Sequence, residues 1–128
     1  MKTFTLALFL PALAFASPGP SFYRALNLVE TSGCSGPILA DSGKALGPFC
    51  IHRQYWQDAK VSGHYSDCAD FNYSRKVVSS YLRRYAPKAW QTSDLETLAR
   101  IHNGGPQGAS RAATLPYWRK VRAVLSHP

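Results

Sequence analysis

The sequence predicts an α+β fold that is predominantly helical, with a short β-hairpin region after the first helix. Three observations support this prediction. Apolar residues recur at intervals of three and four in several segments, which is the period of an amphipathic helix. The segment 34–47 is rich in turn residues and poor in strong helix formers, which indicates a hairpin or an irregular loop. Proline, glycine and capping residues bound the periodic segments.

The first 16 of the 128 residues have the pattern of a secretory signal. They contain one lysine, an apolar run and the sequence Ala-Phe-Ala before Ser17. The run is too short to span a bilayer, which needs ~20 apolar residues, and no later segment comes closer. We therefore expect a signal at 1–16, one domain at 17–128, no membrane span, and a secreted, extracellular monomer.

Five helices are expected in the rest of the chain. The first leads through an apolar stripe into Glu30 and stops at Ser32-Gly33, the third ends before Pro87, and the fourth opens on the capping-box pattern Ser93-Asp-Leu-Glu96. A proline in the first turn is compatible with the second helix. The predicted helices cover residues 22–31, 48–59, 67–85, 93–101 and 115–125.

The chain is basic, with 15 Lys and Arg against 7 Asp and Glu and a net charge of +8. A basic secreted protein is expected to meet a nucleic acid, an anionic membrane or an acidic polymer such as a bacterial wall. Nucleic acid is disfavoured for an exported protein whose basic residues are dispersed along the chain. The alternative interpretation of each local basic cluster is a solvated helix face.

Cys34, Cys50 and Cys68 are an odd number of cysteines for an oxidising compartment, which permits one disulfide and one free thiol. We expect a Cys34–Cys68 pair, with Cys50 buried. The cysteines are far apart and the histidines are not clustered, a poor pattern for a zinc site. We therefore expect no metal and no cofactor.

Glu30 and Asp41 are candidates for a pair of catalytic carboxyl groups. Helix geometry puts Glu30 on or beside a buried face, where lost solvation is expected to raise its pKa toward neutrality, as a general acid requires. Asp41 follows in a turn, where it stays ionised, and glycoside hydrolysis needs this asymmetry. The alternatives are a surface glutamate near a helix end and an ordinary Asp-Ser-Gly turn.

The stretch "RIHNGGPQG" at residues 100–108 is the most specific pattern in the chain. Two glycines after Asn103 allow positive φ and close approach of the backbone to another chain or a ligand. His102 is placed to hydrogen-bond a substrate or a carboxylate of the site. The alternative is a helix end with a packed histidine.

Five segments together resemble the invertebrate-type lysozymes, the group that includes destabilase. They occur in the family's order and cover nearly all of residues 23–122. The segments are "VETSGC" (29–34), "GPFCIHRQYWQDA" (47–59), "SDCADFNYSRKVVSSYLRRYA" (66–86), "LARIHNGGPQG" (98–108) and "LPYWRKV" (115–121).

The resemblance implies a lysozyme-like fold and hydrolysis of the β-1,4 link between N-acetylmuramic acid and N-acetylglucosamine in peptidoglycan. It assigns the general acid/base to Glu30 and the second carboxylate, as nucleophile or electrostatic stabiliser, to Asp41. The chain departs from the family where Cys50 replaces a glutamine and where few cysteines remain. Lys44 stands where destabilase-like members carry a serine linked to isopeptidase activity, so this second activity is not expected.

Residues with side chains or backbone suited to sugars complete the candidate site. Tyr55 is an aromatic that either packs in the core or stacks on a sugar ring, and a surface role is the alternative for His52. The candidate substrate contacts are His102, Asn103, Gly104, Tyr55 and His52. The rival hypothesis is a lysozyme-like protein that has lost catalysis and binds wall glycans or chitin oligosaccharides.

Overall fold

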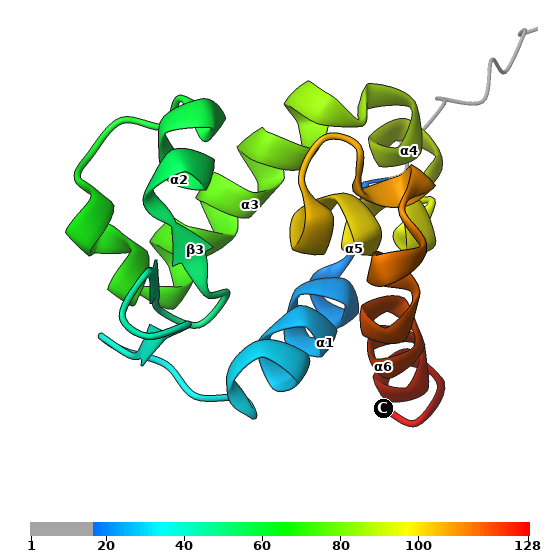
Figure 1. Ribbon diagram of the computed structural model, residues 1–128, viewed down its shortest axis with the longest axis horizontal. Helices are drawn as coiled ribbons and strands as arrows, with labels where there is room; N and C mark the ends of the chain where they lie inside the picture. The colour runs from blue at the N-terminus through cyan, green and yellow to red at the C-terminus, as the bar shows by residue number, and fades with distance from the viewer. Residues whose placement is uncertain (1–16) are drawn as a thin grey trace, which may run out of the picture.

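The computed structural model describes residues 17–128, so the predicted signal at 1–16 lies outside the described part. Six α-helices and a small sheet make up the described chain, and the α+β prediction is confirmed (Figure 1). The α-helices are α1 (Pro20–Thr31), α2 (Arg53–Ala59), α3 (Phe71–Tyr85), α4 (Pro87–Thr92), α5 (Leu95–Gly104) and α6 (Leu115–Ser126). Short 3-10 helices occupy Tyr65–Ala69, Gly108–Ser110 and Ala112–Thr114.

The sheet is a three-stranded antiparallel meander that lies where the sequence predicts a β region. Its strands are β1 (Leu39–Ala40), β2 (Ala45–Leu46) and β3 (Ile51–His52), in the spatial order β1-β2-β3. Leu39 pairs with Leu46, which in turn pairs with Ile51. Figure 1 shows the sheet and α2 on one side of the molecule, α1, α5 and α6 on the other, and α3 running between the two sides.

The core lies between α1, α3, α5 and α6 and extends under the sheet. Its largest fully buried side chains come from the apolar stripes that the helical spacing predicts and from the Pro48-Phe49 turn. These residues are Phe22, Leu26, Pro48, Phe49, Ile51, Val77, Val78, Leu82, Leu98 and Val121. No helix described between residues 17 and 128 is long and apolar enough to cross a membrane.

Asn27 joins the end of α1 to the turn before β3. Its side-chain amide is buried and donates hydrogen bonds to the backbone oxygens of Cys34 at 2.9 Å and Pro48 at 3.0 Å. Gly47 in the same turn has φ +80°, and a Cβ there would overlap the carbonyl oxygen of Cys68. Only glycine tolerates both conditions, so the turn can approach Cys68 closely. The hydrogen bonds from Asn27 hold the same turn beside the end of α1.

The structure corrects the starts of two predicted helices and adds a helix that was not predicted. The segment 48–59 begins as a turn and strand β3, and its helix starts only at Arg53. The predicted helix 67–85 is a 3-10 helix followed by α3, which starts at Phe71 because the Asp70 carboxylate accepts a hydrogen bond from the backbone N–H of Tyr73. Pro87 does more than end α3, because it is the first residue of α4, a position where a missing N–H is harmless.

The cap of α5 is also shifted by one residue from the prediction. Asp94, not Ser93, is the N-cap, and its carboxylate accepts hydrogen bonds from the backbone N–H and the hydroxyl of Thr97. Ser93 has φ +50° and is the C-cap of α4. The two helices therefore follow each other with a single pair of capping residues between them. Helix α5 ends at Gly104, three residues beyond the predicted end at Ile101.

The expected Cys34–Cys68 disulfide is not formed in the structure, where all three cysteines are free thiols. Cys34 is exposed after α1, whereas the Cys68 side chain is fully buried in the core. Cys50, expected to be buried, is only half-buried.

Candidate active site

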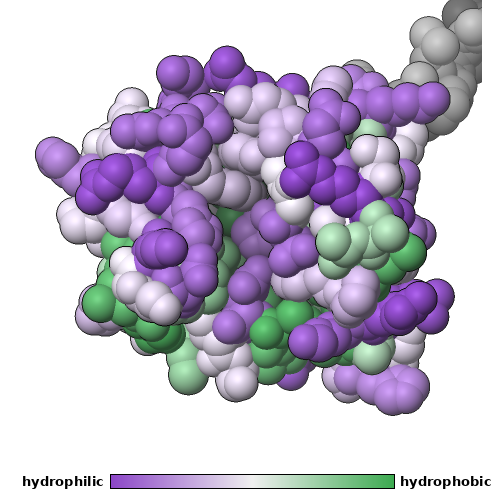
Figure 2. All heavy atoms as spheres, viewed as in Figure 1, coloured by the Kyte–Doolittle hydropathy of each residue, from purple (hydrophilic) through white to green (hydrophobic). Residues whose placement is uncertain are grey.

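The C-terminal part of α1 presents Glu30 to a cleft of about 380 Å³. The opposite wall comes from the sheet, with Asp41 in the turn between β1 and β2. In the space-filling view, which has the same orientation as Figure 1, the surface is hollowed near its centre and hydrophilic residues predominate there (Figure 2). The residues that line the cleft are Glu30, Ala40, Asp41, Ala45, Cys50, His52, Tyr55, His102, Asn103 and Gly105.

The two carboxyl groups differ in their access to solvent. The Glu30 side chain is 18% exposed, and the Asp41 side chain is 63% exposed. Asp41 has φ +49°, which aspartate tolerates better than most residues, and its Oδ2 lies 3.3 Å from Nε2 of His52. One carboxyl group is therefore largely withdrawn from water, while the other keeps both solvent and an imidazole neighbour.

Two side chains contact the same oxygen of Glu30. The Tyr117 hydroxyl donates a hydrogen bond to Oε1 at 2.8 Å, and Nε2 of His102 lies 3.4 Å from that oxygen. Neither of these contacts uses Oε2. Two side chains from separate helices thus converge on one oxygen of the carboxyl group.

A second layer of contacts orients His102. Its Nδ1 lies 2.9 Å from the Tyr55 hydroxyl, and the Tyr55 ring stacks on Tyr81 with ring centroids 3.7 Å apart. The His102 side chain is 3% exposed. Because both ring nitrogens have fixed neighbours, the imidazole has one orientation, in which it faces Glu30.

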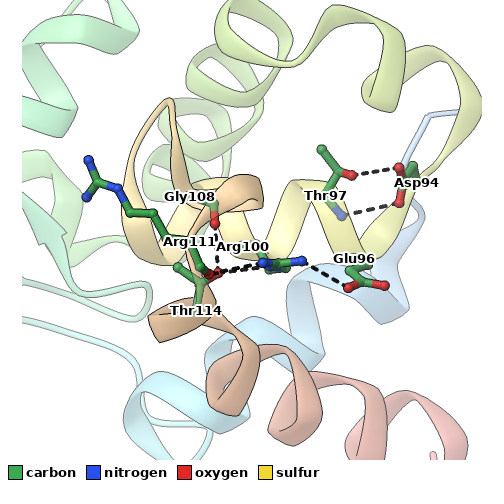
Figure 3. A network of polar contacts seen from close by, with 7 residues as sticks. All are labelled: Asp94, Glu96, Thr97, Arg100, Gly108, Arg111 and Thr114. Atoms are coloured by element: carbon green, nitrogen blue, oxygen red, sulfur yellow. Dashed lines mark hydrogen bonds and ion pairs between the residues drawn. The ribbon is translucent and has the colours of Figure 1, made fainter.

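A network of polar contacts holds the segment between α5 and α6 (Figure 3). The Arg100 guanidinium donates hydrogen bonds to the Thr114 hydroxyl at 2.9 Å and to the Arg111 carbonyl at 3.0 Å. The Thr114 hydroxyl also bonds the Gly108 carbonyl at 2.7 Å. Thr114 directly precedes α6, so this network sets where α6 begins and brings Tyr117, in its first turn, to Glu30.

The pKa of Glu30 is below its ordinary value, contrary to the rise expected from the sequence. Burial of the carboxyl group raises its pKa, but the hydrogen bond and the charge of His102, with hydrogen bonds from Tyr117 and Cys50, outweigh burial. These partners are distant from Glu30 in the sequence, so the local pattern around Glu30 indicates only the effect of burial. The contribution of charge exists only while the imidazole is protonated.

Three of the groups around Glu30 have raised pKa values and remain neutral. Burial and the neighbouring Glu30 raise the pKa of Cys50 to about 12 and raise that of Tyr117 well above its ordinary value. Burial likewise raises the pKa of Tyr55 well above its ordinary value. Tyr117 is therefore a lasting hydrogen-bond donor, and Cys50 is a thiol that lines the cleft rather than a thiolate nucleophile.

The cleft brings together most of the predicted site residues. Glu30, Asp41, His52, Tyr55, His102 and Asn103 all line it. Gly104 does not, because it packs against Thr114, where a Cβ would lie 2.5 Å from Cγ2. Gly105 lines the cleft instead.

Comparison with known proteins identifies the family. The sequence profile of the Destabilase family matches residues 26–124. The chain is 34% identical over 97 residues to a lysozyme of Ostrea edulis, a match that covers 73% of this chain and 71% of the relative. The chain belongs to the destabilase family of invertebrate-type lysozymes.

Further matches agree with this membership. Lysozyme 1 of Crassostrea virginica is 38% identical over 93 residues, which is 71% of this chain but only about half, 49%, of the relative. The crystal structure of Tapes japonica lysozyme superposes with a TM-score of 0.70 at 33% identity, and the match covers 84% of this chain and 93% of that chain. The resemblance predicted from five sequence segments is confirmed, and this invertebrate-type lysozyme is a glycoside hydrolase that acts on a glycan.

Tyr117 and Cys50 are the contacts of Glu30 that sequence reasoning missed. Tyr117 is 87 residues from Glu30, and in the sequence it stands out only as part of the segment "LPYWRKV". The Cys50 thiol lies 3.8 Å from the Glu30 backbone oxygen. A local pattern could not reveal either contact, because each depends on how separate elements pack.

Proposed function

We propose that this chain is a secreted muramidase that cleaves the β-1,4 bond between N-acetylmuramic acid and N-acetylglucosamine in bacterial peptidoglycan. Residues 1–16 serve as the export signal in this proposal. Glu30 is the general acid/base, and Asp41 is the nucleophile or electrostatic stabiliser. The observation that carries the proposal is one cleft lined by two carboxyl groups of opposite character, one withdrawn from water and one exposed.

The contacts of Glu30 support its role as the proton donor. Tyr117 and His102 both contact Oε1, and we assign to Oε2 the proton that passes to the glycosidic oxygen. In the free protein the pKa of Glu30 is lowered, which favours the carboxylate. A glycan bound in the cleft removes water from Glu30, and this additional desolvation acts to raise the pKa and favour the acid form.

Asp41 supports the developing positive charge at the anomeric carbon. It lies on the sheet wall of the cleft, where its side chain is exposed to solvent and its Oδ2 is 3.3 Å from Nε2 of His52. A charged carboxylate is what an oxocarbenium-like transition state requires from the second group. Tyr55, His52, His102, Asn103 and the backbone around Gly105 are available to orient the sugar rings.

Two isosteric variants test the pair of carboxyl groups. Glu30→Gln removes the proton donor and Asp41→Asn removes the charge, so each is expected to slow wall clearing and the release of reducing ends by about a hundredfold or more. Asp58→Asn is the matched control, since it removes one negative charge from a side chain that does not line the cleft. It is expected to retain wild-type activity.

Two results would contradict the proposal. If Glu30→Gln and Asp41→Asn clear walls as fast as the wild type, the mechanism with two carboxyl groups is wrong. If the wild type sediments with the wall but releases no reducing ends, the rival of a binding protein without catalysis is correct. Assaying a soluble peptidoglycan oligosaccharide beside intact walls separates cleavage from wall binding.

A further inference from the structure

A second surface, outside the cleft, carries a concentration of positive charge. A groove of about 380 Å³ runs along α3 and is lined by Asn72, Arg75, Lys76, Ser79 and Arg83. We call it the α3 groove. It shares no lining residue with the cleft that contains Glu30 and Asp41.

The polar groups of the α3 groove form a row along the helix. Arg75, Ser79 and Arg83 are spaced by four residues, so they lie on one face of α3, one turn above another. At 1.5 Å per residue, the row from Arg75 to Arg83 spans about 12 Å. A surface of this form suits an extended anion with repeated charges better than a single small ion.

Two aromatic rings hold the guanidinium groups in place. Arg75 lies over the Tyr23 ring, 4.9 Å from its centroid, and Arg83 lies over the Trp90 ring at 5.6 Å. The Tyr23 hydroxyl lies 2.7 Å from the Ser79 hydroxyl, which also donates to the Arg75 carbonyl. The arginines are therefore partly ordered before any ligand binds, which lowers the entropy cost of binding.

No acid compensates the charge of the α3 groove within residues 17–128. The ion pairs found there join His52 to Asp41, His64 to Asp67, Arg100 to Glu96 and His102 to Glu30. Asp70, at the start of α3, accepts a hydrogen bond from the Tyr73 backbone instead. Arg75, Lys76 and Arg83 are exposed and available to an external anion.

We propose that the α3 groove binds the phosphate groups of a linear phosphodiester polymer of the bacterial wall, such as poly(glycerol phosphate). A guanidinium group donates two parallel hydrogen bonds to phosphate oxygens, and a row of them matches phosphates repeated along a chain. The choice of a wall polymer rests on the proposed muramidase function. The α3 groove then holds the enzyme on the wall while the separate cleft works on the glycan.

The lining of the α3 groove favours such a polymer over single-stranded nucleic acid. Proteins that bind single strands offer aromatic faces on which bases stack. Here the Tyr23 ring is almost wholly buried, and Arg75 and Arg83 already lie over the Tyr23 and Trp90 rings. The α3 groove supplies charge and hydrogen bonds but no free stacking platform.

The test measures binding of the full-length mature protein to soluble poly(glycerol phosphate). The double variant Arg75→Gln/Arg83→Gln is expected to weaken binding by about tenfold and to reduce its salt dependence, because two phosphate contacts are lost. The matched control is Arg119→Gln/Arg122→Gln, which removes the same two charges from exposed positions on α6. The control is expected to change binding by less than about twofold.

Hydrolysis of a soluble peptidoglycan oligosaccharide is measured in parallel. Both double variants are expected to retain the wild-type rate, since neither touches the cleft. If the wild type fails to hydrolyse the oligosaccharide but the polymer result holds, the proposed function fails and phosphate binding stands. If hydrolysis holds but the two double variants bind the polymer equally, only the inference about the α3 groove fails.

Competitors and a second variant complete the experiment. Polyglutamate of equal charge that binds as tightly would show that any anion suffices, and single-stranded DNA that binds more tightly would favour nucleic acid. Either result overturns the proposal.

A second variant, Lys76→Gln, covers the case in which the double variant lowers the melting temperature. The Lys76 side chain stacks on no ring, so this substitution leaves the cation–π contacts intact and should weaken binding about threefold. An unchanged affinity for Lys76→Gln in a folded protein would also count against the proposal.

Discussion

At the scale of single residues, Glu30 depends on partners that come from other elements. Its Oε1 is held by Tyr117 of α6 and faces His102 of α5, which is itself oriented by Tyr55 of α2. The sequence predicts Glu30 as an acid and His102 as a neighbour of a substrate or carboxylate. It does not predict that their interaction reverses the expected direction of the Glu30 pKa shift.

His102→Gln is expected to move the alkaline limb of the activity profile to higher pH. A protonated imidazole stabilises the Glu30 carboxylate and so lowers the pH at which the acid form is lost. Glutamine retains a hydrogen-bond donor but carries no charge, whereas burial, which raises the pKa, remains. The limb is read from kcat/KM against pH, which reports the free enzyme.

Other groups that face Glu30 do not obscure this result. Tyr117, Tyr55 and Cys50 have raised pKa values and stay neutral through the relevant range, and Asp41 remains in place across the cleft. His64→Gln is the control, because His64 is exposed and pairs with Asp67 away from the cleft. An alkaline limb that stays in place, or moves to lower pH, in His102→Gln would refute the role assigned to His102.

At the scale of elements, local signals predict where helices exist better than where they begin. Helices α1 and α6 match the predicted ranges closely because their apolar stripes are continuous. Helix α4 was missed because proline both ends one helix and starts another, and the sequence around Pro87 does not distinguish these roles. The cap of α5 was misplaced because Ser93 and Asp94 are both good N-cap residues.

Asp94→Ala and Ser93→Ala distinguish the two possible caps of α5. Asp94→Ala removes the acceptor for the backbone N–H and hydroxyl of Thr97 and is expected to lower the free energy of unfolding by about 1 kcal/mol. Ser93→Ala is expected to change it by less than about 0.5 kcal/mol. Urea unfolding followed by circular dichroism measures both. If Ser93→Ala lowers the free energy of unfolding more than Asp94→Ala does, the N-cap of α5 is Ser93, as the capping-box pattern predicts.

At the scale of the whole molecule, apolar packing holds the fold together and no covalent cross-link joins the described elements. The core draws on α1, α3, α5 and α6 and on the turn before β3. Cys68 contributes to that core as a fully buried thiol, and Cys34 lies on the surface. A free buried cysteine behaves as a small apolar residue, so its place in the core needs no disulfide.

Thiol counting is expected to find three free cysteines. In denaturant without reductant, a thiol reagent such as Ellman's should titrate all three, and a reductant should leave the melting temperature unchanged. In the native protein Cys34 should react first because it is exposed, and Cys68 only on unfolding. A count of one thiol would instead establish the disulfide that the odd cysteine number suggested.

The sequence by itself determined the α+β class, the family and the candidate residues Glu30, Asp41 and His102. The class and the candidate residues follow from helical periodicity, turn chemistry and short motifs, which act between residues close in the chain. The family follows from the resemblance of five segments. The difference in exposure between the Glu30 and Asp41 carboxyl groups could be predicted in the same way, because a helix face is buried and a turn is exposed.

Only the tertiary structure decided which groups surround Glu30 and therefore which way its pKa moves. Tyr117 reaches it because Arg100 and Thr114 set the start of α6, and Cys50 lies beside it because Asn27 ties α1 to the Pro48 turn. The α3 groove likewise needs rings from α1 and α4 over the arginines of α3. Electrostatic and hydrogen-bonding effects depend on distance in space, and packing alone brings residues that are distant in sequence within that range.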